Sequence, residues 1–322
     1  MRRRAFLGLA AGAAAVPFAA VAQSRIYRVG FLSLEQGEDM TLLTRQMGEL
    51  GYTEGANLSV LYRSAEGDPA RLAALAVELV QAKPDVLVAG WGTLAPKALK
   101  AATDSLPIVF STVGDPVGAG LVQSLARPGG NLTGLSGQST DFKSKQLQLL
   151  MMIVPGQKRV GVLMNPDTPY TALALKELKA AADQIGVRLD ILEMRKREDL
   201  TAVHLEALAA AGAASLFILE DPLTAALKGT IVAEATRLRL PMMTGLNDFA
   251  YAGALMTYGP TLSRRYQQTA RYVDRILKGA KPGDLPVEQP TSFQLVVNQK
   301  SAKAIGVVVP QSVLAIADEI IE

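Results

Sequence analysis

A glycine-containing segment in the first third of the chain could hold a small anionic ligand. Gly90-Trp91-Gly92-Thr93-Leu94-Ala95 matches the G-x-G-x-x-A pattern of dinucleotide-binding loops. That pattern belongs after the first strand of a fold, with an acid about 20 residues later. Here it follows a third strand-like run, and Asp104 and Asp115 lie 14 and 25 residues from Gly90. The glycines would let the backbone approach a ligand, Thr93 could cap the following helix, and the free N–H groups there could hold a carboxylate. We therefore expect this segment to bind a ligand carboxylate, with a dinucleotide as the alternative.

Trp91, the only tryptophan of the chain, lies in the same segment. An aromatic ring there would form a wall for an apolar or aromatic ligand side chain. Packing in a hinge or in the core is the alternative for Trp91. Tyr170, Phe249 and Tyr258 are further aromatic candidates, and Tyr258 is included in the predicted site, although core packing is the favoured explanation for each of the three.

Acidic and amide residues follow several other apolar runs and could hold a charged ligand group. Asp115, in Gly114-Asp115-Pro116-Val117, could bind an ammonium group or cap the helix that Pro116 would begin. Asp221-Pro222 repeats this pattern, and Asn165-Pro166 resembles it. Each is also an ordinary cap or turn pair. We expect the polar side of the site to comprise Asp115, Asn165, Asp221, Asn247 and Asp248.

Catalytic and metal chemistry find little support in the residue types present. The chain has no cysteine, and His204 is its only histidine, which excludes thiolate metal sites, cysteine nucleophiles and most histidine-based triads. Gly134-Leu135-Ser136-Gly137 is not a nucleophile elbow, because its second glycine comes one residue early. No set of residues supplies a nucleophile, a base and an orienting group together. We therefore predict a binding protein without a metal or a cofactor, and not an enzyme.

The basic character of the chain is confined to its first residues. Lysine and arginine number 33 against 30 acidic residues, and Arg2, Arg3 and Arg4 account for the difference of three. The remaining chain is formally neutral, so its charge gives no reason to expect a nucleic-acid partner.

Residues 1–22 have the pattern of an export signal. Arg2–Arg4 precede an apolar run from Ala5 to Val16, and Ala20-Val21-Ala22 is an A-x-A cleavage site. Arg3-Arg4-Ala5-Phe6-Leu7 resembles the twin-arginine signal, although Arg2 replaces the usual Ser or Thr, which leaves the general secretory route open. We expect an exported, soluble, periplasmic protein, without a lipid anchor because there is no cysteine.

The candidate residues follow strand-like segments that alternate with helical ones. Apolar runs at 26–33, 85–89 and 107–110 predict strands, as does the alternating segment 57–63. Helical periodicity covers 41–50, 69–83 and 94–103. An alternating order of this kind predicts a parallel sheet with helices on both faces.

This order then recurs about 130 residues later. Tyr27–Leu32 matches Lys158–Leu163, Glu49–Tyr52 matches Gln184–Val187, Asp85–Ala89 matches Ser215–Leu219, and Leu106–Phe110 matches Leu240–Thr244. The offsets are 131, 135, about 130 and 134 residues, a nearly constant spacing that predicts a repeated α/β lobe. The candidate residues follow strand ends, where open parallel sheets bind ligands. Two such lobes would share a cleft and close on a small ligand.

Further blocks of sequence resemble the ABC transporter substrate-binding family, whose members have a type I periplasmic-binding-protein fold. The resemblance covers residues 25–322 and rests above all on Gly114–Val117 and on Arg127-Pro128-Gly129-Gly130-Asn131-Leu132-Thr133-Gly134. It is supported by Glu49–Leu58, Tyr258-Gly259-Pro260 and Leu285–Thr291. The family implies two similar doubly wound lobes with a ligand cleft between them, and a receptor that delivers a solute to an ABC permease of the inner membrane.

Studied members similar to this chain bind aromatic amino acids, so the resemblance implies an amino acid or an analogue as the solute. We expect a monomer with a first lobe of residues 25–135 and about 258–283. The second lobe would comprise about 136–257 and 284–322. The alternatives are a ligand-sensing module for a signalling partner and an exported nucleotide-binding enzyme. A final amphipathic helix is predicted over 313–320.

Overall fold

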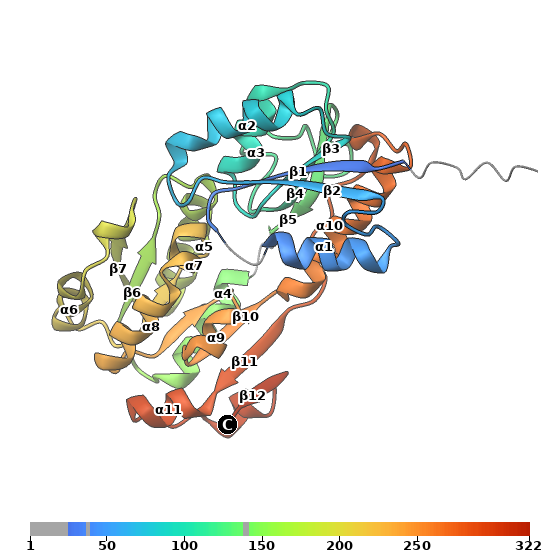
Figure 1. Ribbon diagram of the computed structural model, residues 1–322. Coiled ribbons are helices and arrows are strands. Elements are labelled where there is room, and N and C mark those ends of the chain that lie inside the picture. The colour runs from blue at the N-terminus through green and yellow to red at the C-terminus, as the bar shows by residue number, and fades with distance from the viewer. Residues whose placement is uncertain (1–24, 37–38, 138–141) are drawn as a thin grey trace, which may run out of the picture.

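The computed structural model describes residues 25–36, 39–137 and 142–322 (Figure 1). The predicted export signal lies outside these residues. Two sheets form the framework of two lobes, one above the other in Figure 1. Within the described part of the chain, no helix is long and apolar enough to span a membrane.

The first lobe contains a five-stranded sheet in the order β2-β1-β3-β4-β5, and every pair in it is parallel. Its strands are β1 (Tyr27–Ser33), β2 (Leu58–Ser64), β3 (Val86–Ala89), β4 (Ile108–Val113) and β5 (Leu132–Ser136). Its helices include α1 (Asp39–Glu49), α2 (Leu72–Gln81) and α3 (Leu94–Ala102). All four residues of the central strand β3 are buried, as expected of a parallel strand covered on both faces.

The second lobe contains a seven-stranded sheet in the order β12-β11-β10-β9-β8-β6-β7. Its strands are β6 (Arg159–Met164), β7 (Arg188–Glu193), β8 (Leu216–Ile218), β9 (Met242–Thr244), β10 (Met256–Gly259), β11 (Gln294–Asn298) and β12 (Glu319–Ile321). Its helices are α4 (Phe142–Ile153), α5 (Pro169–Ile185), α6 (Ala202–Ala210), α7 (Pro222–Ala226), α8 (Lys228–Arg237), α9 (Asp248–Ala252), α11 (Gln299–Ile305) and α12 (Gln311–Leu314). Only the β10–β11 pair is antiparallel.

The predicted repeat is confirmed by the strand order. β2-β1-β3-β4-β5 of the first sheet corresponds to β7-β6-β8-β9-β10 of the second. The second lobe then adds β11 and β12 at the edge beyond β10. Each sheet is covered on both faces, because the buried apolar residues fall into two clusters in each lobe. In β1, for example, Phe31 belongs to one cluster and Leu32 to the other.

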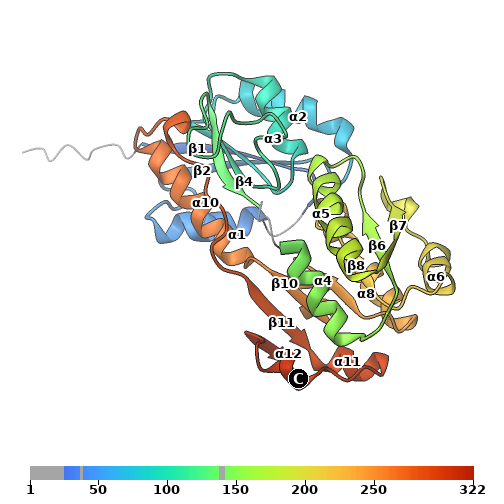
Figure 2. The ribbon, with the colours of Figure 1, turned by 180° about the vertical axis from the view of Figure 1, so that it is seen from behind.

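The long helix α10 (Leu262–Leu277) returns from the second sheet to the first lobe. It packs beside α1 and against the first sheet (Figure 2). Tyr266 and Tyr272 on α10 are buried in that core, and the hydroxyl of Tyr52 donates to Asp274 Oδ1 at 2.8 Å. After α10, Ser136 N on β5 donates to Glu288 O at 2.7 Å. The chain after α10 thus lies beside β5 at Glu288.

The predicted helix over 313–320 is wrong. The structure has the short helix α12 and then β12, which pairs with β11 in parallel register, Val297 opposite Ile320. Pairing with a sheet edge satisfies the backbone of 319–321 and overrides the helical spacing of its apolar residues.

Candidate functional site

A cavity of about 210 Å³ lies between the two lobes. The first lobe lines it with Trp91, Gly92, Thr93, Thr112, Gly114, Leu135, Ser136 and Gly137. The second lobe contributes Phe142, Thr168, Tyr170, Glu220, Pro222, Ala225, Gly245, Leu246, Asn247 and Asp248. The connecting segments contribute Pro260, Thr261, Arg264, Arg265, Gln268 and 288–292. Most of these residues lie at or just after the carboxyl ends of parallel strands, where the sequence places the site.

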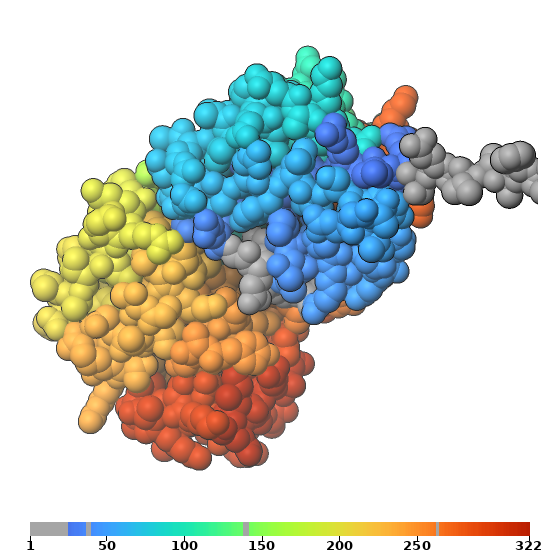
Figure 3. All heavy atoms as spheres, in the orientation of Figure 1, coloured from blue at the N-terminus to red at the C-terminus, as the bar shows by residue number. Residues whose placement is uncertain are grey.

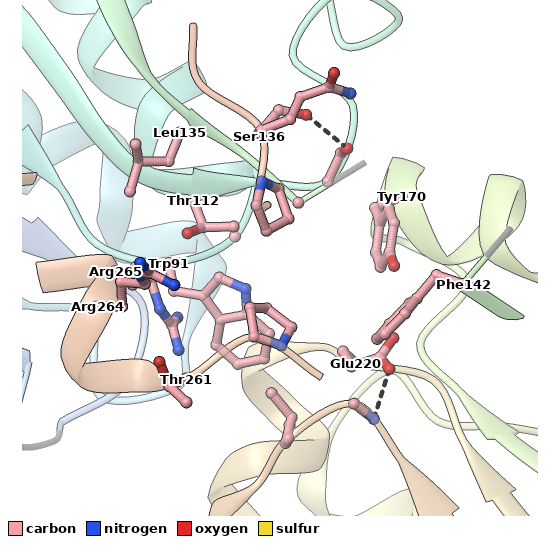
Figure 4. Close-up of a pocket in the computed structure, with 18 of the residues that line it drawn as sticks. Trp91, Thr112, Leu135, Ser136, Phe142, Tyr170, Glu220, Thr261, Arg264 and Arg265 are labelled. Atoms are coloured by element: carbon pink, nitrogen blue, oxygen red, sulfur yellow. Dashed lines mark hydrogen bonds between the residues drawn. The ribbon is translucent and has the colours of Figure 1, made fainter. Parts of the chain in front are cut away.

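The loop after β3 forms one wall of the cavity. Trp91 lies beside α10, and its ring is 5.5 Å from Cζ of Arg265 (Figure 4). Gly92 has a φ of +101°, which favours glycine, and its N–H donates to Thr112 O at 3.0 Å. Thr93 is buried and lines the cavity. The expected cap of α3 by the Thr93 side chain is absent, because Thr93 has a helical backbone and makes no side-chain bond there.

A buried ion pair supports the opposite wall. Lys143 on α4 is 1% exposed, and its ammonium group pairs with the carboxylate of Glu220, which follows β8. Gly245 N donates to Glu220 Oε1 at 2.7 Å, and Gln146 Nε2 does so at 3.2 Å. Burial lowers the pKa of Lys143, and the Glu220 carboxylate opposes this shift. The charge of Glu220 is therefore compensated from behind the cavity wall.

Aromatic rings cover this same wall. Phe142 and Tyr170 face the cavity from the second lobe, across from Trp91 (Figure 4). Burial raises the pKa of Tyr170 well above its ordinary value, and the nearby Glu220 raises it further. The ring of Tyr258 lies 5.6 Å from that of Phe142, and Phe293 lies 5.0 Å from Phe142. Tyr258 thus supports a lining residue and is not among the lining residues itself.

Asp221 and Asn165 form a buried polar cluster beside the cavity. The Asp221 carboxylate accepts hydrogen bonds from Leu223 N at 2.8 Å, Asn165 Nδ2 at 3.1 Å and Thr168 Oγ1 at 2.5 Å. Burial raises the pKa of Asp221, and these hydrogen bonds oppose the shift. Neither Asp221 nor Asn165 lines the cavity. Asp221 caps α7 and holds Thr168, which does line it.

Of the other predicted polar contacts, Asn247 and Asp248 line the cavity and Asp115 does not. Asp115 accepts from Gly118 N at 2.8 Å and so caps a turn outside the cavity lining. Asn247 lines the cavity, donates to Gln294 Oε1 at 3.3 Å, and has a buried Oδ1 without a hydrogen-bond partner among the described residues. Asp248 lines the cavity and pairs with Lys228 at 2.5 Å. The structure therefore brings Trp91, Thr93, Asn247 and Asp248 together around one space.

The two lobes touch each other around the cavity (Figure 3). A Cβ built on Gly114 would lie 2.1 Å from Cγ of Tyr170, and one built on Gly92 would lie 2.9 Å from Cγ of Pro222. Arg197 Nη2 in the second lobe donates to Glu35 Oε2 in the first at 2.8 Å. These contacts define a state in which the cavity is covered by both lobes.

Sequence reasoning did not select Glu220, Lys143, Arg264 or Arg265. Glu220 precedes the Asp221-Pro222 pair, and it is Asp221 that has the turn pattern. Lys143 lies on α4 and the two arginines lie on α10, helices that begin soon after β5 and β10, but no cap or turn pair marks these positions. One signal was available for the arginines, because both lie in the first turn of α10, which has no acidic residue and where helices normally disfavour cations.

Comparison with known proteins gives a consistent assignment. The model of a family described as ABC transporter substrate-binding protein matches residues 42–321. A tyrosine-binding protein of Clostridioides difficile (strain R20291) is 25% identical over 263 residues, which cover 81% of this chain and 74% of that protein.

Solved structures agree with this fold. A conserved domain protein from Vibrio cholerae is 31% identical, with a TM-score of 0.86 over 92% of this chain and 100% of that one. An ABC domain from Streptococcus pneumonia, solved in complex with L-Trp, is 24% identical, with a TM-score of 0.82 over the same shares. The two lobes thus have the type I periplasmic-binding-protein fold, and the family whose model matches consists of substrate-binding proteins and not of enzymes. The chain belongs to the ABC transporter substrate-binding protein family.

Proposed function

We propose that this protein binds an amino acid with an aromatic or other apolar side chain between its two lobes. The observation that carries the proposal is the cavity itself, which combines facing aromatic rings with charged and amide groups from both lobes. Such a composition suits a small ligand with an apolar body and a zwitterionic head. Similarity to a tyrosine-binding protein and to a structure that contains L-Trp supports the same ligand class.

The size of the cavity favours a small solute. Pockets for drug-sized ligands have volumes of about 300–1,000 Å³, and this one has about 210 Å³. A dinucleotide would not fit between lobes that touch at Gly114 and Tyr170. An amino acid needs less space and would have its ring or aliphatic chain near Trp91, Phe142 and Tyr170.

In this proposal the head group of the amino acid binds polar groups that lack an internal partner or face the cavity. The free Oδ1 of Asn247 is suited to accept a hydrogen bond from the ligand's ammonium group. Thr93 and Asp248 line the same space and are proposed as further contacts. Asp115, Asn165, Asp221 and Tyr258 would act on the ligand only through the residues that they position.

The proposed role in the cell, delivery of a solute to a membrane transporter, rests on the family and on the predicted export signal. We propose that residues 1–22 direct export, that the mature protein works in the periplasm as a monomer, and that its closed form delivers the amino acid to an ABC permease of the inner membrane. Closure of two lobes on a ligand offers the permease a surface that differs between the loaded and the empty receptor.

Fluorescence of Trp91 offers a direct test of ligand binding. Because Trp91 is the only tryptophan of the chain, its emission reports on the cavity wall. Titration with L-tyrosine, L-phenylalanine or L-leucine should change the emission saturably at one-to-one stoichiometry. The Trp91→Phe variant should lose the signal while calorimetry still detects binding. Absence of binding heat for all three amino acids would contradict the proposal.

A further inference from the structure

The guanidinium group of Arg265 borders the cavity without an internal counterion. It stacks over the ring of Trp91, with Cζ 5.5 Å from the ring centroid, and lies 5.7 Å from the ring of Tyr266. Among the residues that the structure describes, it has no hydrogen-bond or ion-pair partner. A guanidinium carries five N–H donors in one plane, so the donor fork of Arg265 is available to a ligand.

Each of the other charged side chains that line the cavity has a polar partner, either an opposite charge or a neutral hydrogen-bonding group. Glu220 pairs with Lys143, and Asp248 pairs with Lys228. Glu288 accepts a hydrogen bond from Gln268 Nε2 at 3.0 Å, and Arg264 donates to the hydroxyl of Ser292. Among the charged side chains that line the cavity, Arg265 is therefore the one for which the described residues supply neither an ion pair nor a hydrogen bond, and its charge is positive.

The position of Arg265 is also unfavourable for the helix that carries it. Arg264 and Arg265 lie in the first turn of α10, which has no acidic residue, so two cations face the positive end of the helix dipole. Neither charge is needed for packing, because the core contacts of α10 come from Tyr266, Tyr272 and Val273. A charge that opposes the helix dipole beside a cavity is expected at a functional position.

We propose that Arg265 binds the carboxylate of the solute, and that the Trp91 ring holds the guanidinium plane in the orientation needed for two parallel hydrogen bonds. Arginine forms planar, two-bond pairs of this kind with carboxylates and phosphates, and lysine does not; in an amino acid the carboxylate is the group of this kind. The inference rests on the proposed function and narrows it to carboxylate-bearing solutes. Both glycine N–H groups of the loop after β3 are already used, because Gly90 N donates to Leu32 O and Gly92 N donates to Thr112 O.

Acid and amide pairs of one amino acid test this role by calorimetry. The probes are L-tryptophan and L-tryptophanamide, then L-tyrosine and L-leucine with their amides, since each pair shares its ammonium group and side chain. The unaltered protein should bind the acid more tightly than the amide by on the order of 10- to 100-fold, as expected for hydrogen bonds between charged groups. Arg265→Gln should remove most of that preference by weakening the acid and leaving the amide nearly unchanged.

Two further variants separate binding from folding. Arg265→Lys keeps the charge without the planar fork and should recover only part of the preference. Arg271→Gln makes the same substitution at an exposed position of the same helix, outside the cavity lining, and should leave the preference intact. Equal affinity for acid and amide in the unaltered protein would overturn the role of Arg265 while leaving amino-acid binding in place. No binding of any of the three acids would overturn both.

Discussion

Lys143 is a buried cation whose charge is balanced by the carboxylate of Glu220. Its ammonium group lies inside the second lobe against Glu220, surrounded by the rings of Phe142, Tyr170 and Phe217. Removing one member of a buried pair leaves the other charge uncompensated in a medium of low polarity. The ion pair therefore holds the Glu220 side chain in the cavity wall. Loss of either member should lower the free energy of unfolding.

Substitution of Lys143 by Met should lower the free energy of unfolding by about 3–5 kcal/mol, measured by urea denaturation. The double variant Lys143→Met, Glu220→Gln should recover part of that loss, because no isolated charge remains. Lys145→Met is the matched control, since Lys145 is an exposed neighbour on the same helix, and it should change stability by less than about 0.5 kcal/mol. A double variant less stable than Lys143→Met alone would contradict this account of the pair.

For individual side chains the sequence is a weaker guide: it could predict which loops face the cavity, but not which of their side chains do. Trp91, Thr93, Asn247 and Asp248 line it because they follow strand ends. Asp115 and Asp221 follow strand ends as well, yet they cap turns. An aspartate that caps a helix and one that binds a ligand use the same oxygens, so local sequence does not separate them. Arg265 and Lys143 lie soon after the ends of β10 and β5, but neither belongs to a cap or turn pair that would mark it as a candidate.

The junction between β8 and α7 is an element held together by one carboxylate. Asp221 caps α7 and fixes Asn165 and Thr168 in the loop after β6. Loss of this carboxylate would leave several buried donors without acceptors, each at a cost of about 1–3 kcal/mol.

Asp221→Ala should therefore destabilise the protein by about 2–4 kcal/mol in thermal or urea unfolding. Affinity for L-tyrosine should change far less under conditions where the variant is folded, because Asp221 does not line the cavity. Asp115→Ala is the comparison, since Asp115 accepts one hydrogen bond at a turn and should cost about 1 kcal/mol. A large loss of affinity in Asp221→Ala at unchanged stability would instead make Asp221 a ligand contact.

Periodicity predicts most of the elements because the core strands are short apolar runs and the helices have one apolar face. The prediction fails where pairing with a distant strand decides the outcome. β12 forms because β11 offers an open edge, and the apolar residues of 313–320 fit a helix equally well. β5 has glycine at its centre, Gly134, and a weak strand pattern, but it pairs with β4 and with the segment before Glu288. Such long-range pairings are not encoded in local spacing.

Closure of the cavity depends on how closely the two lobes can approach each other. Gly114 lies against the ring of Tyr170, where a Cβ would be 2.1 Å from a ring carbon. The φ of Gly114 is not in the left-handed region, so alanine would fit there if the lobes were apart. The contact thus limits closure and leaves the folding of each lobe unaffected.

Gly114→Ala should weaken binding of L-tyrosine by about 10-fold or more, because the closed form becomes less accessible. Stability without ligand should stay nearly unchanged. Small-angle scattering should show less compaction on ligand addition than in the unaltered protein. Gly229→Ala is the control, since nothing lies near a Cβ at Gly229. Normal affinity and compaction in Gly114→Ala would show that closure does not bring these residues together.

Closure should also depend on pH through Glu35. Its carboxylate pairs with Arg197 of the other lobe, and its Oε1 is buried without a partner among the described residues. Burial raises the pKa of Glu35, Arg197 opposes the shift, and Asp221 adds to it. We expect parting of the lobes to expose this carboxylate and to bring its pKa back towards the ordinary value, so that the closed form would bind more protons than the open form.

Affinity for L-tyrosine should therefore rise as the pH falls from neutral through the pKa of Glu35 in the closed form. The gain is complete below the ordinary pKa of glutamate and is lost as the pH rises. Binding isotherms between about pH 5 and pH 7.5 test this, with Glu35→Gln expected to flatten the dependence. An affinity that falls with acidity in the unaltered protein, and is unchanged by Glu35→Gln, would contradict this linkage.

A crystal structure of the protein grown with L-tyrosine or L-tryptophan tests the central claim most directly. We expect one amino acid in the cavity, its side chain between Trp91 and the rings of Phe142 and Tyr170, its carboxylate on Arg265, and Gly114 in contact with Tyr170. An amino acid bound outside this cavity, or to one lobe with the other held away from it, would contradict the claim that the space between the lobes is the solute site.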